Sequence, residues 1–293
     1  MRKLASRAEP RGPSGTVLTA IPQSGYGART DKGRVRENNE DSFAVQSELN
    51  LFVLSDGMGG QASGEIASRI ATETVVEYCL AAERDSLSVP ELERLSGLSD
   101  ASSQLAAGVR RANSAIRSAT IDHAERQGMG ATIVAVRFEG CRMSVAHVGD
   151  SRAYRFRSGQ LEQLTRDHSF VSEQLRQGLL TPEEAEQSQL QNVLLRALGP
   201  EPDVEIDVTE ELVLDGDAVL LCSDGLTREI GDAQIAAILE QDEEPQAAAD
   251  HLVEAANEAG GADNITVMVV RPAGKRGGAF ARIGRWLKGP KES

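Results

Sequence analysis

The sequence has little of what marks secreted, zinc-ribbon or membrane-spanning proteins. Its 293 residues include three cysteines, too few for a disulfide framework, and none of them stands in a Cys-x-x-Cys pair. The longest apolar runs, such as 131–136, are far too short to span a bilayer, and the first residues contain no apolar signal-peptide core. We therefore expect a cytoplasmic protein, long enough to bury a full hydrophobic core.

The chain also lacks the excess of positive charge that nucleic-acid binding requires. It has 45 Asp and Glu against 31 Lys and Arg, a net charge of −14, whereas phosphate backbones are bound by clustered Lys and Arg. Residues 1–24 carry a net +3 and residues 271–293 a net +6, which leaves −23 for residues 25–270. We expect no nucleic-acid partner, and the acidic body needs an explanation.

Composition divides the chain into a central domain between two basic ends. Residues 1–24 mix Pro, Gly, Ser and Arg without periodicity, which predicts a disordered basic arm. Residues 25–271 hold the periodic segments and show no internal repeat, which predicts one catalytic domain. Residues 272–293 form a basic amphipathic tail that fits contact with an anionic membrane or a partner; a disordered solubilising tail fits equally well.

Hydrophobic periodicity predicts an α+β fold, with antiparallel sheets covered by helices. Helices are expected at 65–80, 105–123, 232–240 and 245–259, and within 168–200, where Thr181-Pro-Glu-Glu provides a cap, a first-turn proline and acidic residues. Strands are expected at 43–45, 51–54, 131–138, 142–148, 153–156, 160–164, 204–208, 218–221 and 265–270.

The informative residues are acids at the ends of apolar segments. Asp56 and Asp224 each follow a strand-like run within the string Ser-Asp-Gly, and Asp150 and Asp263 lie beside two other strands. A single Asp-Gly after an apolar run is usually only a turn. Asp215-Gly216, between two strand-like segments, is predicted to be such a plain hairpin.

If these acids converge at one end of a sheet, their charges repel. Two carboxylates about 4 Å apart cost on the order of 4 kcal/mol at an effective dielectric of 20, so such a cluster takes up protons or holds cations. Oxygen ligands without His or Cys favour Mg²⁺ or Mn²⁺ over zinc. Convergence does not follow from spacing alone, so both the turn and the metal interpretation stay open at this point.

Seven short motifs occur in one order between residues 25 and 270. They are Arg36-Glu-Asn-Asn-Glu-Asp41, Ser55-Asp-Gly-Met-Gly-Gly60, Gly128-Met-Gly-Ala-Thr132, Val148-Gly-Asp-Ser-Arg152, Asp167-His-Ser169, Ser223-Asp-Gly225 and Asp263-Asn-Ile-Thr266. Together they resemble the ordered motifs of the metal-dependent protein phosphatase family, in its bacterial type-2C Ser/Thr branch. The resemblance implies two packed antiparallel β-sheets flanked by helix pairs, with two Mn²⁺ or Mg²⁺ ions in a cleft at one end.

The resemblance also assigns metal ligands. It implies that Asp56 bridges both metals, that Asp224 and Asp263 complete one metal site, and that the Gly57 carbonyl serves the other.

Further assignments from the resemblance concern the second metal, a third metal and the substrate. Glu40 and Asp41 would hold the second metal directly or through its waters, and Asp150, with Asp224, matches a third, weaker metal site. Arg36 matches the arginine that grips the substrate phosphate.

The implied activity is hydrolysis of phosphoserine and phosphothreonine in proteins by a metal-activated water, opposing a Ser/Thr kinase. Met58 stands where eukaryotic relatives place a histidine proposed as general acid, so the leaving group must take its proton from a metal-bound water or another residue. His168 qualifies only by residue type, and we expect it and His147 to pack locally. Residues 169–189 correspond to the variable flap beside the cleft, although an ordinary exposed helix pair fits the same composition.

We expect a monomer, and the sequence disfavours two other functions. A catalytically silent relative that binds phosphoproteins would show lost acids, and every expected acid is present. An acidic calcium-binding protein would carry its ligands within one short loop, whereas these acids spread over about 220 residues.

Overall fold

The computed structural model describes residues 25–59, 63–84, 94–121 and 128–272. The predicted basic arm at 1–24 and the predicted amphipathic tail, from residue 273 onward, lie outside the described residues.

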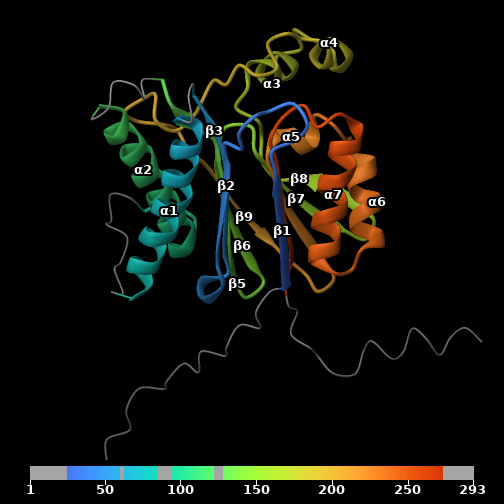
Figure 1. Cartoon of the computed structure of the whole chain (residues 1–293). Helices are drawn as coiled ribbons and strands as arrows, with labels where there is room; N and C mark the ends of the chain where they lie inside the picture. Colours follow the sequence, from blue (N-terminus) through green and yellow to red (C-terminus); the bar gives the residue numbers. More distant parts are fainter. Residues whose placement is uncertain (1–24, 60–62, 85–93, 122–127, 273–293) are drawn as a thin grey trace, which may run out of the picture.

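Two antiparallel sheets face each other in the middle of the molecule (Figure 1). One sheet contains, in spatial order, β1 (Gly25–Asp31), β11 (Ile265–Arg271), β10 (Ala218–Cys222), β7 (Arg152–Arg157) and β8 (Gln160–Gln163). The other contains β2 (Asp41–Gln46), β3 (Leu51–Met58), β5 (Ile133–Glu139), β6 (Arg142–Val148) and β9 (Asp207–Leu212), with the short β4 (Gly130–Ala131) paired to β3. We call them the five-stranded and the six-stranded sheet.

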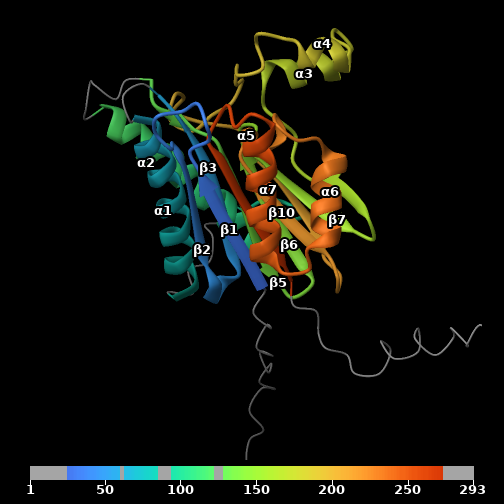
Figure 2. The same ribbon diagram turned by 45° about the vertical axis from the view of Figure 1, so that its right-hand side comes forward.

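Helix pairs cover the outer faces of the two sheets, which confirms the predicted fold (Figures 1 and 2). The pair α1 (Ser63–Arg84) and α2 (Asp100–Ile121) lies on the six-stranded sheet, and the pair α6 (Asp232–Gln241) and α7 (Pro245–Ala259) on the five-stranded sheet. The one-turn α5 (Asp224–Thr227) follows β10 at one end of the sandwich. The short helices α3 (Phe170–Arg176) and α4 (Pro182–Glu186) project beyond the end at which α5 lies. A helix apolar and long enough to cross a membrane is absent from the described residues.

The central strands are mostly apolar on both faces, because both of their faces are buried. In β3, Phe52 and Leu54 point into the core between the sheets, whereas Leu51 and Val53 pack against α1 and α2. Successive side chains of a strand point to opposite faces, so a strand covered on both sides has no polar face. By the same alternation, Asp56, two residues after Leu54 in β3, points to the side that faces the other sheet.

Two local predictions were wrong and one strand was missed, each for an identifiable reason. Strand β1 was not predicted, because it is an edge strand, only partly buried, whose sequence mixes glycine with polar residues. The strand expected at 204–208 is displaced to Asp207–Leu212, since Val204 and Ile206 pack against the α1–α2 cluster without joining the sheet. The Asp215-Gly216 turn is not a hairpin, because β9 and β10 belong to different sheets.

The packing between the sheets yields a stability prediction. Phe52 is buried in the inter-sheet core, and its ring meets Phe138 edge-on at a centroid distance of 5.9 Å. Phe52→Ala should lower the free energy of unfolding by about 3–5 kcal/mol, because it removes contacts and leaves a cavity. Leu212→Ala, at a side chain 60% exposed on β9, is the control and should stay within about 0.5 kcal/mol. Urea denaturation of both variants measures the difference, and equal losses would contradict the assignment of the core.

Candidate active site

Strand pleating brings Asp41 and Asp56 to one end of the space between the sheets. Phe52 and Leu54 point into the inter-sheet core, and Asp56 continues the same alternation at the end of β3. Asp41 begins β2 and is the register partner of Asp56. The two carboxylates are therefore neighbours across adjacent strands, at the end where the sheets separate.

Two more acids reach this end from the five-stranded sheet. Asp224 is the first residue of α5, just after β10, and Asp263 precedes β11. Ser223 joins the two sheets, because its hydroxyl donates to Asp41 Oδ2 over 2.8 Å and accepts from the Thr266 N–H over 3.0 Å. The serine of the second Ser-Asp-Gly string thus forms hydrogen bonds to residues of both sheets.

The glycines of both Ser-Asp-Gly strings are required by close backbone approaches. A Cβ on Gly57 would lie 2.0 Å from the Gly64 carbonyl oxygen, and one on Gly225 would lie 2.1 Å from the Asn264 carbonyl oxygen. No side chain fits at such distances. Both strings therefore place an acid at a strand end, followed by a chain that touches another backbone, and neither is a simple turn.

Thr132 and Asn264 hold the acid-bearing segments in place. The Asp56 N–H donates to Thr132 Oγ1 over 3.0 Å, and the Thr132 N–H donates to the Asp56 carbonyl over 2.8 Å. The Asn264 side chain accepts from the Glu40 N–H and donates to the Asn38 carbonyl, each over 2.8 Å. Neither residue was singled out in the sequence, although both stand inside the ordered motifs.

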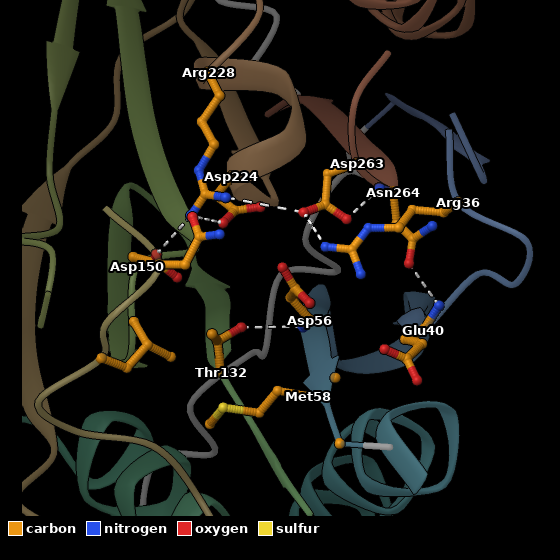
Figure 3. A pocket seen from close by; sticks show the side chains of 14 residues that line it. Arg36, Glu40, Asp56, Met58, Thr132, Asp150, Asp224, Arg228, Asp263 and Asn264 are labelled. Atoms are coloured by element: carbon orange, nitrogen blue, oxygen red, sulfur yellow. Dashed lines mark hydrogen bonds and ion pairs between the residues drawn. The ribbon is translucent and has the colours of Figure 1, made fainter. Parts of the chain in front are cut away.

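These residues surround a cavity of about 210 Å³ (Figure 3). Of the eight residues predicted as site residues, seven line the cavity: Arg36, Glu40, Asp56, Gly57, Asp150, Asp224 and Asp263. The eighth, Asp41, is buried behind them, where it accepts a hydrogen bond from the Ser223 hydroxyl. The structure thus brings together all the acids that the resemblance singled out, from both sheets.

Burial and mutual repulsion raise the pKa values of these acids. Burial, reinforced by the charge of Asp224, raises the pKa of Asp41 and of Asp150 to about 7. Burial and then the charge of Asp41 raise the pKa of Asp56, and burial raises that of Asp224. Such acids gain from a divalent cation, which replaces the lost hydration and removes the repulsion.

Unsatisfied oxygens point to the same kind of ligand. Oδ1 of Asp41 and Oδ1 of Asp224 are buried and have no hydrogen-bond partner among the described residues. Because a buried oxygen without a partner is costly, a group that supplies positive charge fits this position. The donor set is all oxygen, which fits Mn²⁺ or Mg²⁺.

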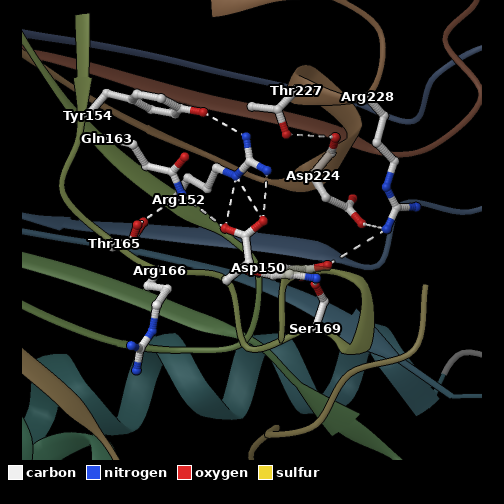
Figure 4. A network of polar contacts seen from close by, with 12 residues as sticks. Asp150, Arg152, Tyr154, Gln163, Thr165, Arg166, Ser169, Asp224, Thr227 and Arg228 are labelled. Atoms are coloured by element: carbon white, nitrogen blue, oxygen red, sulfur yellow. Dashed lines mark hydrogen bonds and ion pairs between the residues drawn. The ribbon is translucent and has the colours of Figure 1, made fainter. Parts of the chain in front are cut away.

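Two arginines lie among the acids. Arg36 Nη2 is 2.8 Å from Asp263 Oδ2. Arg228, at the end of α5, forms an ion pair with Asp224, and its Nη2 is 3.7 Å from Asp150 Oδ2 (Figures 3 and 4). The sequence interpretation missed Arg228; the available signal was its spacing of four residues from Asp224.

The histidines belong to a separate, local cluster. His147 and His168 stack with a centroid distance of 4.7 Å, and His168 Nε2 lies 3.3 Å from Asp207 Oδ2. Burial lowers the pKa of His168 to about 4, so its ring is neutral at physiological pH. Neither ring lines the cavity, whereas Met58 does; no histidine occurs among the described lining residues.

The segment 169–189 lies beside the site, a position that fits both the flap and the ordinary exposed helix pair. It contains α3 and α4, and α4 begins with the capping box expected at Thr181, whose hydroxyl accepts from the Glu184 N–H. A second cavity, of about 860 Å³, separates these helices from the body and also touches Asp150 and Arg228. Its wall includes the ion pair of Arg152 with Asp167. Arg152 Nη1 also donates to the Tyr154 hydroxyl (Figure 4).

Comparison with known proteins gives consistent relatives. The chain is 38% identical over 244 residues to the Ser/Thr protein phosphatase PstP of Mycobacterium tuberculosis, covering 83% of this chain and 44% of that protein. The chain thus spans less than half of that relative's length. It is also 35% identical over 245 residues to the Ser/Thr phosphatase stp of Listeria innocua, covering 83% of this chain and 93% of the relative.

Solved structures agree with these relatives. The crystal structure of M. tuberculosis PstP superposes with a TM-score of 0.74, at 38% identity, covering 85% of this chain and 99% of that chain. The PstP catalytic domain in complex with two manganese ions gives a TM-score of 0.72, at 38% identity and with 85% and 98% coverage. The profile of the protein phosphatase 2C family matches residues 30–263, which include nearly all of the ordered motifs. This protein therefore belongs to the protein phosphatase 2C family.

Proposed function

We propose that this protein is a Mn²⁺- or Mg²⁺-dependent phosphatase that hydrolyses phosphoserine and phosphothreonine in cytoplasmic proteins, in opposition to a Ser/Thr kinase. The observation that carries the proposal is the convergence of acids from both sheets on one cavity that also contains Arg36. Relatives of the same family carry the name Ser/Thr phosphatase, and one structure of PstP is a complex with two manganese ions. A catalytically silent relative is disfavoured, because none of the expected acids is missing.

In this proposal a different set of acids binds each of the two cations. Asp56, central in the cavity, would serve both ions; Asp224 and Asp263 would complete one site, and the Gly57 carbonyl would serve the other, as the family resemblance implies. Glu40 and Asp41 act on the second site directly or through water. When bound, two divalent ions supply a water of lowered pKa as nucleophile for in-line attack on phosphorus.

Arg36 and Met58 bear on two steps, the binding of the substrate phosphate and the protonation of the leaving oxygen. Arg36 is 48% exposed and is oriented by Asp263, so its planar guanidinium faces the cavity and binds the phosphate oxygens through two parallel hydrogen bonds. The Met58 side chain carries no dissociable proton. Since the described lining residues include no histidine, we assign the proton for the leaving serine or threonine oxygen to water.

Removal of one carboxylate tests the metal mechanism. In Asp224→Asn, phosphopeptide hydrolysis with Mn²⁺ should fall on the order of 100-fold or more, because metal binding supplies several kcal/mol of transition-state stabilisation. EDTA should abolish turnover of the unmodified protein, and added Mn²⁺ should restore it. Asp250→Asn, at an exposed carboxylate on α7, is the matched control and should keep full activity. Turnover that survives both chelation and Asp224→Asn would refute the mechanism.

Arg36→Lys tests phosphate binding separately from metal binding. Lysine keeps the charge and loses the two-pronged geometry, so we expect kcat/KM for a phosphopeptide to fall about 10- to 100-fold. Mn²⁺ affinity, measured by calorimetry, should change little. Arg29→Lys, on the opposite side of β1 from the site and paired with Glu254, is the control. Unchanged kcat/KM in Arg36→Lys would remove Arg36 from the substrate site.

The raised pKa values predict a pH-dependent stability of the metal-free protein. Because folding raises the pKa of Asp41 and of Asp150 to about 7, the folded state holds protons that the unfolded chain has already released. The contribution of these groups to stability is present at low pH and is lost as the pH rises through about 7. The gain in melting temperature on adding Mn²⁺ should therefore be larger near about pH 8 than near about pH 5.

Thermal unfolding in EDTA and in Mn²⁺ across this pH range measures the effect. Asp150→Asn should reduce the pH dependence of the EDTA curve, whereas Asp250→Asn should leave it unchanged. A gain from Mn²⁺ that is the same at both pH values would contradict the prediction.

A further inference from the structure

Arg228 lies between the two acids that the resemblance assigned to a third metal. Its Nη2 forms the ion pair with Asp224 and is 3.7 Å from Asp150 Oδ2, and its Nη1 is 3.9 Å from Asp263 Oδ2. Among the described residues, Arg228 provides the only ion pair of Asp150. The guanidinium thus contacts the carboxylates that would otherwise hold an ion there.

We propose that Arg228 is a built-in cation that takes the place of the third metal, so that the cleft binds two divalent ions and excludes a third. The inference rests on the two-metal function proposed above and specifies the metal content of the same site. A guanidinium keeps its proton at every physiological pH, so its charge is permanent, unlike that of an exchangeable ion.

Charge balance supports two ions and no third. The cluster comprises the six predicted acids, Glu40, Asp41, Asp56, Asp150, Asp224 and Asp263. Asp167 also acts on Asp150 but is neutralised by its ion pair with Arg152. Glu65, which acts on Glu40, is half exposed on α1. Arg36 and Arg228 supply two positive charges, so two divalent cations bring the cluster to neutrality. A third divalent ion would add two uncompensated charges to a largely buried site, which is unfavourable.

The backbone holds Arg228 close to these acids. The Arg228 N–H donates to the Asp224 carbonyl over 2.9 Å and closes the single turn of α5. Its side chain is 28% exposed, and the side chains of Asp150 and Asp224 are 10% and 13% exposed. An ion arriving between these two acids would therefore have to displace a guanidinium that is already partly desolvated and anchored next to them.

The experiment counts bound Mn²⁺ by equilibrium dialysis with metal analysis, which does not depend on activity. The unmodified protein should bind two ions. Arg228→Gln should bind a third, at least about tenfold more tightly than any third ion in the unmodified protein. Arg228→Gln combined with Asp150→Asn should return to two ions, and Arg228→Lys, which keeps the charge, should also bind two.

Arg36→Gln is the matched control, because it removes the same charge from the same cluster but from the other side of Asp263. It should not gain a third ion, and a gain would show a general charge effect and overturn the proposal. Three ions in the unmodified protein, or two in Arg228→Gln, would also overturn it. Arg228→Ala should bind three ions, as Arg228→Gln should. Circular dichroism of each variant checks that it is folded. Failure of the unmodified protein to bind any Mn²⁺ would instead refute the proposed two-metal function.

Discussion

Electrostatic repulsion among carboxylates at one end of the sandwich is the constraint around which this structure is arranged. Asp41 and Asp56 are adjacent across two strands of one sheet, and Asp224 and Asp263 meet them from the other sheet. Folding gives these groups less hydration and more neighbours of like charge, so the site costs stability that the rest of the fold must supply. The apolar inter-sheet core and the two helix-covered faces provide it, since the central strands are buried on both sides.

Much of the site could be predicted from the sequence because the strands that carry it are unusually apolar. A run such as 218–222 marks a buried strand, and an acid directly after it must lie at the strand's end. What the sequence did not contain was convergence, which depends on the order of strands in two different sheets. The ordered motifs supplied that information through the resemblance, while Ser223, Gly57 and Gly225 acquired a physical reason only from the structure.

The errors have a common origin in polar segments whose structure is set by distant partners. Strand β1 is recognisable only through its pairing with β11, and β9, rich in acids, only through its pairing with β6. The turn at Asp215-Gly216 has the composition of a hairpin, yet it carries the chain from one sheet to the other. Arg228 was overlooked for the same reason: an arginine on a short helix looks like a surface residue until Asp150, far away in the sequence, lies beside it.

The hydrogen bond from the Ser223 hydroxyl to Asp41 connects the two sheets at the site, so the distance between the sheets affects the positions of the acids. Since acids from both sheets converge on one cavity, any sliding of one sheet over the other changes the separation of those acids and the coordination they can offer. In the proposed function, cations bound there would connect the two sheets through their carboxylate ligands. The positions of the proposed metal ligands therefore depend on the whole sandwich. A core substitution far from the cleft that changes the spacing of the sheets would also change the distances between these acids.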